Sequence, residues 1–191
     1  MGVDSDRLVA AWRRVFVQSW PVVVEEFLTT LMRTTDIVVT ALFSPAAVAA
    51  LGIADLYGRL STSIGNGLGT GMIALSSQDT GRGSLATRNQ AITQTLLIGV
   101  LTGLPFVGIG FLLNDWLFAV LGSQPEVVRL GGAYLAIIFV ISPARHVERI
   151  GERALQGTGD TRTPMYIRTS SLPTNTLINA VLIFGLGPFP S

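Results

Sequence analysis

The chain has 191 residues, of which 49% are hydrophobic and only 13% are charged, and its mean hydropathy is positive. This composition lies outside the range of ordinary soluble domains and predicts an all-α, polytopic integral membrane protein. The net charge of +1 gives no support for a nucleic-acid partner, and the absence of cysteine excludes disulfides and thiolate metal sites.

Apolar runs separated by helix breakers predict about five membrane-spanning helices, since about 20 helical residues are needed to cross the hydrocarbon core. Turns are expected at Ser44-Pro45 and at the glycine-containing stretches between the later spans. The expected spans are residues 15–42, 46–77, 91–118, 128–150 and 165–187.

The arginines predict the orientation of these spans, because loops on the cytoplasmic side carry the excess of basic residues. If the spans simply alternate, ten arginines share the side of the N-terminus and only Arg129 lies on the other side. A multi-pass protein of the cell membrane with a cytoplasmic N-terminus is therefore expected. Five spans place the C-terminus on the outer side.

The first expected span carries four charges, on Glu25, Glu26, Arg33 and Asp36. At 100° per residue these side chains fall within about 100° of one another, and the opposite side of the helix is apolar. A charge at the centre of a bilayer costs about 2.5–3.5 kcal/mol on insertion scales, so the charged face is expected to line an interior or a watery cavity.

The second expected span repeats this design, with Asp55, Arg59 and Asn66 on one face. Arg33 and Asp55 are expected at similar depths, where they can meet. In the simpler interpretation, the charges of the two spans only pair with each other and hold the helices together.

Asp36 is the candidate for ion coupling. The residue one turn after it is Thr40 rather than a cation, and an intramembrane carboxylate can take a proton or an alkali cation. Asn175 and Asn179 lie on one face of the fifth expected span, just after Pro173, at a depth similar to that of Asp36. Amide oxygens beside carbonyls freed by proline suit Na⁺, although both amides can instead simply bond neighbouring helices.

Four glycines of the second span have the four-residue spacing that allows close helix packing, as the pairs Gly65/Gly69 and Gly67/Gly71. A nucleotide-binding loop is not supported, because no strand precedes them and no basic residue follows at the required distance.

Arg149 is expected to pair with Glu152 at the cytoplasmic end of the fourth span. His146, beside them, is interpreted as a hydrogen-bonded or solvated residue at the membrane boundary rather than a proton relay. Zinc binding and nucleophilic catalysis lack the partner residues that they need, so neither a cofactor nor an enzyme is expected. Asp160 or Thr161 is expected to cap the following helix.

The segment ALQGTGDTRTPMYI, residues 154–167, followed by NTLINAVLIFG, residues 175–185, resembles the multidrug and toxic compound extrusion (MATE) family of transporters. TTDIVVTALFSPAAVAALG is similar to that family's first span and the turn into the second. GMIALSSQDTGRG is similar to the end of its second span.

This resemblance implies an antiporter of twelve helices in two lobes that expels organic, often cationic compounds in exchange for Na⁺ or H⁺. Residues 1–191 match only the first five helices, an incomplete N-terminal lobe that would need the C-terminal helices as partners. By resemblance, Asp36 falls on the carboxylate used for cation coupling and Asn175 on the asparagine beside it. Asn179 departs from the family pattern, which commonly has Asp there, and this lowers the expected affinity for Na⁺.

Two alternatives to drug export remain open. Related exporter folds flip lipid-linked saccharides, and a wide cavity ringed by arginine would favour that function. The chain can also be a truncated fragment that does not transport and only packs against other helices.

Overall fold

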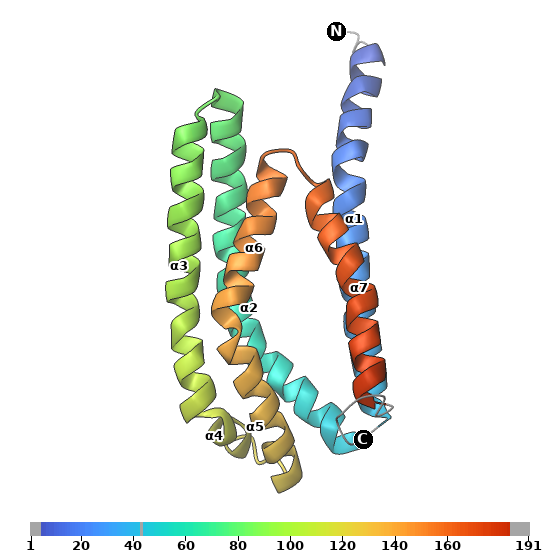
Figure 1. Cartoon of the computed structure of the whole chain (residues 1–191), viewed down its shortest axis with the longest axis vertical. Helices are drawn as coiled ribbons and strands as arrows, with labels where there is room; N and C mark the ends of the chain where they lie inside the picture. The colour runs from blue at the N-terminus through green and yellow to red at the C-terminus, as the bar shows by residue number, and fades with distance from the viewer. Residues whose placement is uncertain (1–4, 43, 184–191) are drawn as a thin grey trace. The chain divides into compact units, whose positions relative to one another are not determined.

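The computed structural model describes residues 5–42 and 44–183, and all regular structure within them is α-helical (Figure 1). The prediction of an all-α protein is thus confirmed. The chain divides into two compact units, residues 1–36 with 159–191 and residues 37–158. The helices are α1 (Ser5–Ala41), α2 (Pro45–Arg82), α3 (Leu85–Leu112), α4 (Asn114–Ala119), α5 (Pro125–Val140), α6 (Ser142–Gly157) and α7 (Arg162–Ile183).

The turns on either side of α2 follow from local chemistry. Ser44 caps its start, because its hydroxyl accepts a hydrogen bond from the backbone N–H of Ala47 at 3.0 Å, and Pro45 occupies the first helical position. Gly83 ends it in the left-handed conformation, at φ 71°, where its N–H bonds the carbonyls of Asp79 and Thr80. The first expected turn is therefore confirmed.

Two expected spans are divided in the structure. The range 91–118 contains a break at Leu113 between α3 and α4, and 128–150 contains a break at Ile141, where α5 and α6 are bent by 50°. Pro143 explains the second break, since it has no N–H to donate and fits best in the first turn of a new helix. A proline in the sequence does not by itself show where a helix breaks, since Pro105 lies inside α3 without ending it.

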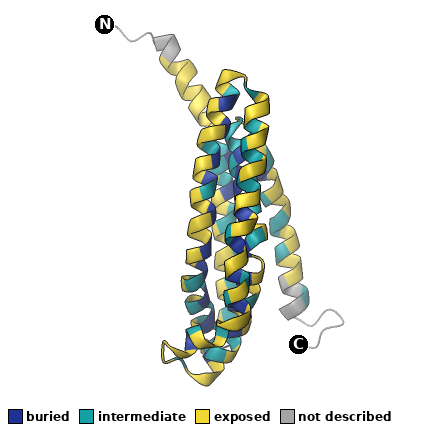
Figure 2. Cartoon of the chain, turned by 90° about the vertical axis from the view of Figure 1, so that its left-hand side faces the viewer, coloured by how far each residue is buried: buried dark blue, intermediate teal, exposed yellow. Residues whose placement is uncertain are grey.

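The unit of residues 37–158 is built around α2, which packs against α3, α5 and α6 (Figure 1). The side of α2 that it buries consists mainly of small residues, which allow the neighbouring helices to approach closely. These residues are Ala50, Ala54, Gly58, Ser61, Gly65, Gly69 and Ser76. Figure 2 shows the buried positions on the inner sides of the helices and exposed positions outside.

Two apolar clusters form the core of this unit. One surrounds Phe106, Phe118 and Phe139, and the other consists of Met72, Ile150 and Ala154. Along α2, α3 and α6 alike, the buried residues between the two clusters are small or polar. A polar layer therefore lies between two apolar ones.

The other unit holds α1 as far as Asp36 together with α7. Both helices run in the same direction, from the upper to the lower part of Figure 1. Asp36 precedes the end of α1 at Ala41, and Asn175 precedes the end of α7 at Ile183. Both residues thus lie toward the same end of this unit.

By length and composition, α3 alone, and α5 with α6 as one bent span, satisfy a simple criterion for crossing a membrane among the described residues. The remaining long helices, α1, α2 and α7, carry the charged and polar side chains that were expected to face an interior. The arrangement of five spans and its orientation stay predictions.

Candidate functional site

The polar face of α1 is its more covered face. Glu25 is buried, with 2% of its surface exposed, and Thr29 and Asp36 farther along the same face are half-buried. Arg33 and Glu26, at the edge of this face, are exposed. The opposite, apolar side is exposed as well, with Phe27 at 64% and other large residues beside it.

Asp36 and Asn175 are both half-buried and belong to the same unit. Both take part in interactions with other groups of the protein. Pro173 lies inside α7, two residues before Asn175, and leaves the backbone carbonyl one turn earlier without its helical N–H donor. The side chain of Asn179 lies outside the described residues, so its place in the site stays a prediction.

The second polar face is less covered. Asp55 is half-buried, whereas Arg59 and Asn66 are exposed. Arg33 and Asp55 belong to different units, so their expected pairing stays a prediction.

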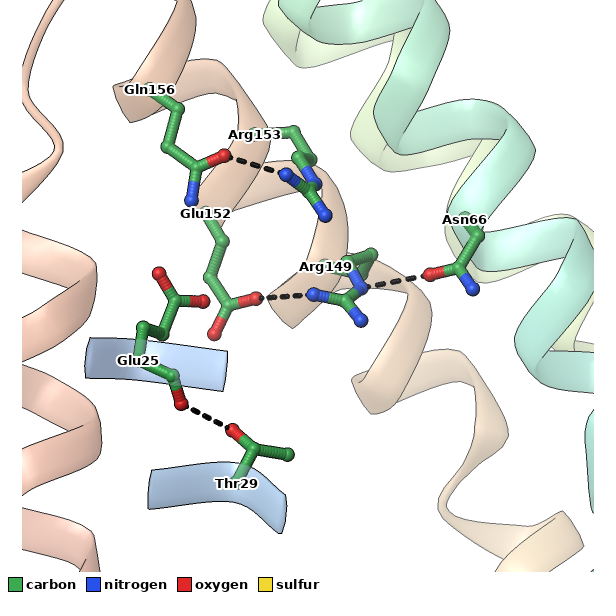
Figure 3. A network of polar contacts seen from close by, with 7 residues as sticks. All are labelled: Glu25, Thr29, Asn66, Arg149, Glu152, Arg153 and Gln156. Atoms are coloured by element: carbon green, nitrogen blue, oxygen red, sulfur yellow. Dashed lines mark hydrogen bonds and ion pairs between the residues drawn. The ribbon is translucent and has the colours of Figure 1, made fainter. Parts of the chain in front are cut away.

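Asn66 belongs to a network of polar contacts between α2 and α6 (Figure 3). The Arg149 guanidinium donates from Nε to Asn66 Oδ1 at 2.9 Å and from Nη1 to Glu152 Oε2 at 3.3 Å. The expected pairing of Arg149 with Glu152 is therefore confirmed. One turn later, Arg153 Nη1 donates to Gln156 Oε1 at 2.8 Å.

Figure 3 also shows how α1 uses its threonines. The hydroxyl of Thr29 donates to the backbone carbonyl of Glu25 at 2.9 Å, within the same helix. The Thr29 hydroxyl therefore bonds the backbone of Glu25 and not its carboxylate.

The loop that carried the resemblance begins α7. Asp160 Oδ1 accepts hydrogen bonds from the backbone N–H groups of Arg162 at 3.2 Å and Thr163 at 3.0 Å, and Oδ2 accepts one from the Thr163 hydroxyl at 2.6 Å. The hydroxyl and then the backbone N–H of Thr163 lower the pKa of this carboxyl below its ordinary value, because they stabilise the charged form. Asp160 is therefore the helix cap, as one of the two expected alternatives.

The four glycines of α2 behave differently from one another. A Cβ atom at Gly65 would lie 2.9 Å from His146 Cδ2, and one at Gly69 would lie 2.9 Å from Arg153 Cγ. No described atom lies within 4 Å of a Cβ placed at Gly67 or Gly71. The prediction of close helix packing is thus confirmed for Gly65 and Gly69, and it is wrong for Gly67 and Gly71 among the described residues.

His146 is a hydrogen-bonded residue, which was one of the two expected alternatives, and it is not solvated. It is 1% exposed, between α2 and α3, where its ring meets Ser61, Gly99 and Thr102. The sequence offered one signal for this burial: Ser61 and Gly65 are four residues apart and therefore lie on the same side of α2, the side that packs against α6. No group of three or more His, Asp or Glu residues suited to a metal ion occurs among residues 5–42 and 44–183.

The chain is similar to known transport proteins. A model of the family MatE matches residues 21–181. A protein of Shewanella oneidensis named "FAD transporter" is 28% identical over 144 residues, which are 75% of this chain and 32% of that protein. A "Probable multidrug resistance protein NorM" of Rhodopseudomonas palustris is 28% identical over 182 residues, which are 92% of this chain and 38% of that protein.

Two solved structures have the same fold. A MOP superfamily transporter from Pyrococcus furiosus matches with a TM-score of 0.79 at 20% identity, and a multidrug resistance MATE family transporter matches with 0.76 at 21%. In both cases the match covers 92% of this chain and 39% of the other. The chain therefore spans between about a third and two fifths of the length of these relatives. It belongs to the MatE family of multi-pass membrane proteins, which are transporters and not enzymes.

Proposed function

We propose that this chain is part of a cation-coupled antiporter, which exports small organic compounds across the cell membrane in exchange for Na⁺ or H⁺. The observation that carries the proposal is the half-buried carboxylate of Asp36 on the covered face of α1, in the same unit as Asn175 of α7. A carboxylate kept inside a membrane is costly, and transporters use such groups to bind the coupling ion. The amide oxygens of Asn175 and Asn179 would complete a site of oxygen ligands.

The remaining polar residues of α1 and α2 would line the path of the substrate. These residues are Glu25, Glu26, Arg33, Asp55, Arg59 and Asn66. Relatives carry names that refer to multidrug resistance and to FAD, so the substrate is proposed only as a small organic compound. Flipping of a lipid-linked saccharide is the alternative, and it predicts transport that does not depend on Asp36.

The chain alone would not transport, because its relatives are more than twice as long and a central path needs a wall on each side. Vesicles that contain only residues 1–191 should therefore show no efflux of a fluorescent organic cation. Efflux from such vesicles would contradict this part of the proposal.

The test of the ion site uses the protein in the length in which the cell makes it. Asp36→Asn should abolish ion-driven efflux but leave the protein in the membrane, because a neutral amide is cheaper there than a carboxylate. Glu126→Gln, at an exposed carboxylate in the first turn of α5, is the matched control and should keep full efflux. Normal coupled efflux of the Asp36 variant would show that the coupling ion binds elsewhere.

Asn179→Asp provides a second test of the same site. In the proposed site it adds a carboxylate close to Asp36, and it should change the dependence of efflux on Na⁺ or pH. An unchanged dependence would exclude Asn179 from the site.

The proposed orientation can be tested directly, because the chain contains no cysteine. Single cysteines at Ser84 and Ser123 lie in the turns after α2 and after α4. A maleimide that does not cross membranes should label Ser123→Cys in intact cells and Ser84→Cys only after permeabilisation. The reverse result would place the N-terminus outside.

A further inference from the structure

We propose that His146 is a proton-binding site in the unit of residues 37–158, where it holds a proton reversibly between α2, α3 and α6. This site is separate from the proposed cation site at Asp36. It rests on the contacts of the ring and not on the proposed transport function.

Both ring nitrogens lie near backbone carbonyl oxygens of other helices. Nε2 is 2.9 Å from the carbonyl oxygen of Ser61 on α2, and Nδ1 is 3.1 Å from the carbonyl oxygen of Gly99 on α3. Carbonyl oxygens can only accept hydrogen bonds, and a neutral imidazole has a single N–H. Both contacts can be hydrogen bonds only when the ring carries a second proton, and such bonds from a charged donor are the stronger ones.

The neutral ring can be satisfied as well, because each nitrogen also meets a hydroxyl. Ser61 Oγ lies 3.1 Å from Nε2, and Thr102 Oγ1 lies 3.3 Å from Nδ1. Either hydroxyl can donate to the nitrogen that has lost its proton. The same oxygens have other uses when the ring is charged, since Ser61 can donate to Ser142 Oγ at 2.9 Å and Thr102 to Ile98 O at 2.9 Å.

None of the residues described in contact with the ring is charged, so none of them can take this proton as a neighbouring carboxylate would. The residues that meet the ring from α2 and α3 are Ser61, Gly65, Gly99, Thr102 and the edge-to-face Phe106. The only charged residue of α3 is Arg88, about 20 Å from Thr102 along the helix.

None of the charged groups of α2 or of α6 itself is among the contacts described for the ring. Arg59, Arg145 and Glu148 are exposed, Asp55 lies about 9 Å before Ser61 along α2, and Arg149 bonds Asn66 and Glu152. The layer that holds His146 lies between the two apolar clusters, which keep water from replacing the carbonyl partners.

The proton would connect three helices. In the charged form, α6 donates one hydrogen bond to α2 and another to α3. In the neutral form, one of these two bonds is replaced by a contact with a hydroxyl that can turn away. The packing of α6 against its neighbours would therefore depend on whether the ring holds one proton or two.

The test uses the fact that His146 is the single histidine of the chain. The 191-residue chain, labelled with ¹⁵N-histidine and carrying no histidine tag, is placed in lipid vesicles, and the two ring nitrogens are observed by solid-state NMR from pH 8 to pH 5. The expected result is one N–H at the high end and two at the low end. A ring that keeps the same number of N–H groups throughout this range overturns the proposal.

Two substitutions should shift the neutral ring in opposite directions. Ser61→Ala removes the donor to Nε2, so the proton of the neutral ring should move to Nε2. Thr102→Val removes the donor to Nδ1, so that proton should move to Nδ1. An identical tautomer in both variants overturns the assigned roles of the hydroxyls, and the wild-type titration tests the proposal even if a variant fails to fold.

Matched controls exist on the same two helices. Ser63 is exposed on α2, and Thr93 is exposed on α3, where its hydroxyl bonds the carbonyl of Asn89. Ser63→Ala and Thr93→Val should leave the tautomers and the titration as in the wild type.

Discussion

Hydroxyl side chains serve different purposes in the two units of the molecule. In α1, Thr29, Thr30, Thr34 and Thr35 each donate to a carbonyl four residues earlier in their own helix. The threonines of α7 do the same at Thr169, Thr174 and Thr176. Such bonds hold no helix to another.

In the unit of residues 37–158, buried hydroxyls reach across to other helices or turns. Ser61 donates to Ser142, Ser76 to the carbonyl of Ala154, and Tyr57 to the carbonyl of Leu117. The exposed Thr62 and Thr70 of α2 instead bond their own helix. The hydroxyls that bond another helix here come from buried or half-buried residues, although the buried Ser142 also donates within its own segment, to Ile138. We therefore expect this unit to depend on contacts between helices, whereas α7 is stabilised at its start by the Asp160 cap.

The largest effect should come from the place where a glycine lies closest to the backbone of another helix among the described residues. A Cβ atom at Gly103 would lie 2.5 Å from Pro143 Cα and 2.6 Å from its N, and backbone atoms cannot easily move away. Gly103→Ala should therefore cost about 1–3 kcal/mol in the free energy of unfolding, measured by denaturation in detergent micelles.

The matched control for this substitution is Gly108→Ala on the same helix, where no atom of the described residues lies within 4 Å of the added carbon. It should be neutral or stabilise by about 0.5–1 kcal/mol, since alanine favours a helix over glycine. Equal effects of the two substitutions would contradict the importance of close packing in this unit.

An intermediate effect is expected at the start of α7. Asp160→Ala removes the cap and should cost about 1 kcal/mol at neutral pH. The pKa of Asp160 is lower in the folded protein than its ordinary value of 3.8. The charged cap therefore stabilises the fold fully at a pH well above 3.8, and this contribution is lost as the pH falls through the lowered pKa. Thermal unfolding at a series of pH values would measure it.

Asp160→Asn separates the charge from the hydrogen bond. It keeps one acceptor oxygen, so it should cost less than Asp160→Ala and lack the loss of stability at acidic pH. If Asp160→Asn and the wild type responded to acid alike, the carboxylate charge would play no part in the cap.

The smallest effect is expected for a single hydroxyl between helices. Ser76→Ala removes the buried bond to Ala154 and should cost about 0.6 kcal/mol, the average for hydrogen bonds between membrane helices. Its neighbour Ser77 is exposed and bonds its own helix at Ala74, so Ser77→Ala should have no measurable effect. Equal chemical denaturation midpoints for the two variants would remove the distinction drawn between buried and exposed hydroxyls.

Features determined by neighbouring residues could be predicted from the sequence. The helices, the turn at Ser44, the cap at Asp160 and the pair Arg149–Glu152 each depend on residues within a few positions of one another. The polar face of α1 also follows from helix geometry, and its burial at Glu25 agrees with the cost of exposing charge to lipid.

Features that need several helices could not be predicted in this way. The environment of His146 is created by Ser61 and Gly99, which are 85 and 47 residues away in the sequence. The four-residue spacing of Gly67 and Gly71 equals that of Gly65 and Gly69, yet only the latter pair faces α6. Which side of a helix meets a neighbour depends on the whole bundle and not on spacing alone.

The bend at Ile141 has a consequence for how the chain can enter a membrane. Pro143 cannot donate a backbone hydrogen bond, yet the hydroxyl of Ser142 donates to the carbonyl of Ile138, and the N–H groups of Ile141 and Arg145 bond the carbonyls of Ile137 and Ile141. The chain thus provides its own donors for the carbonyls of Ile137, Ile138 and Ile141 at the break. These carbonyls need no water as a partner, which lowers the cost of placing the bend within the hydrocarbon when the segment inserts.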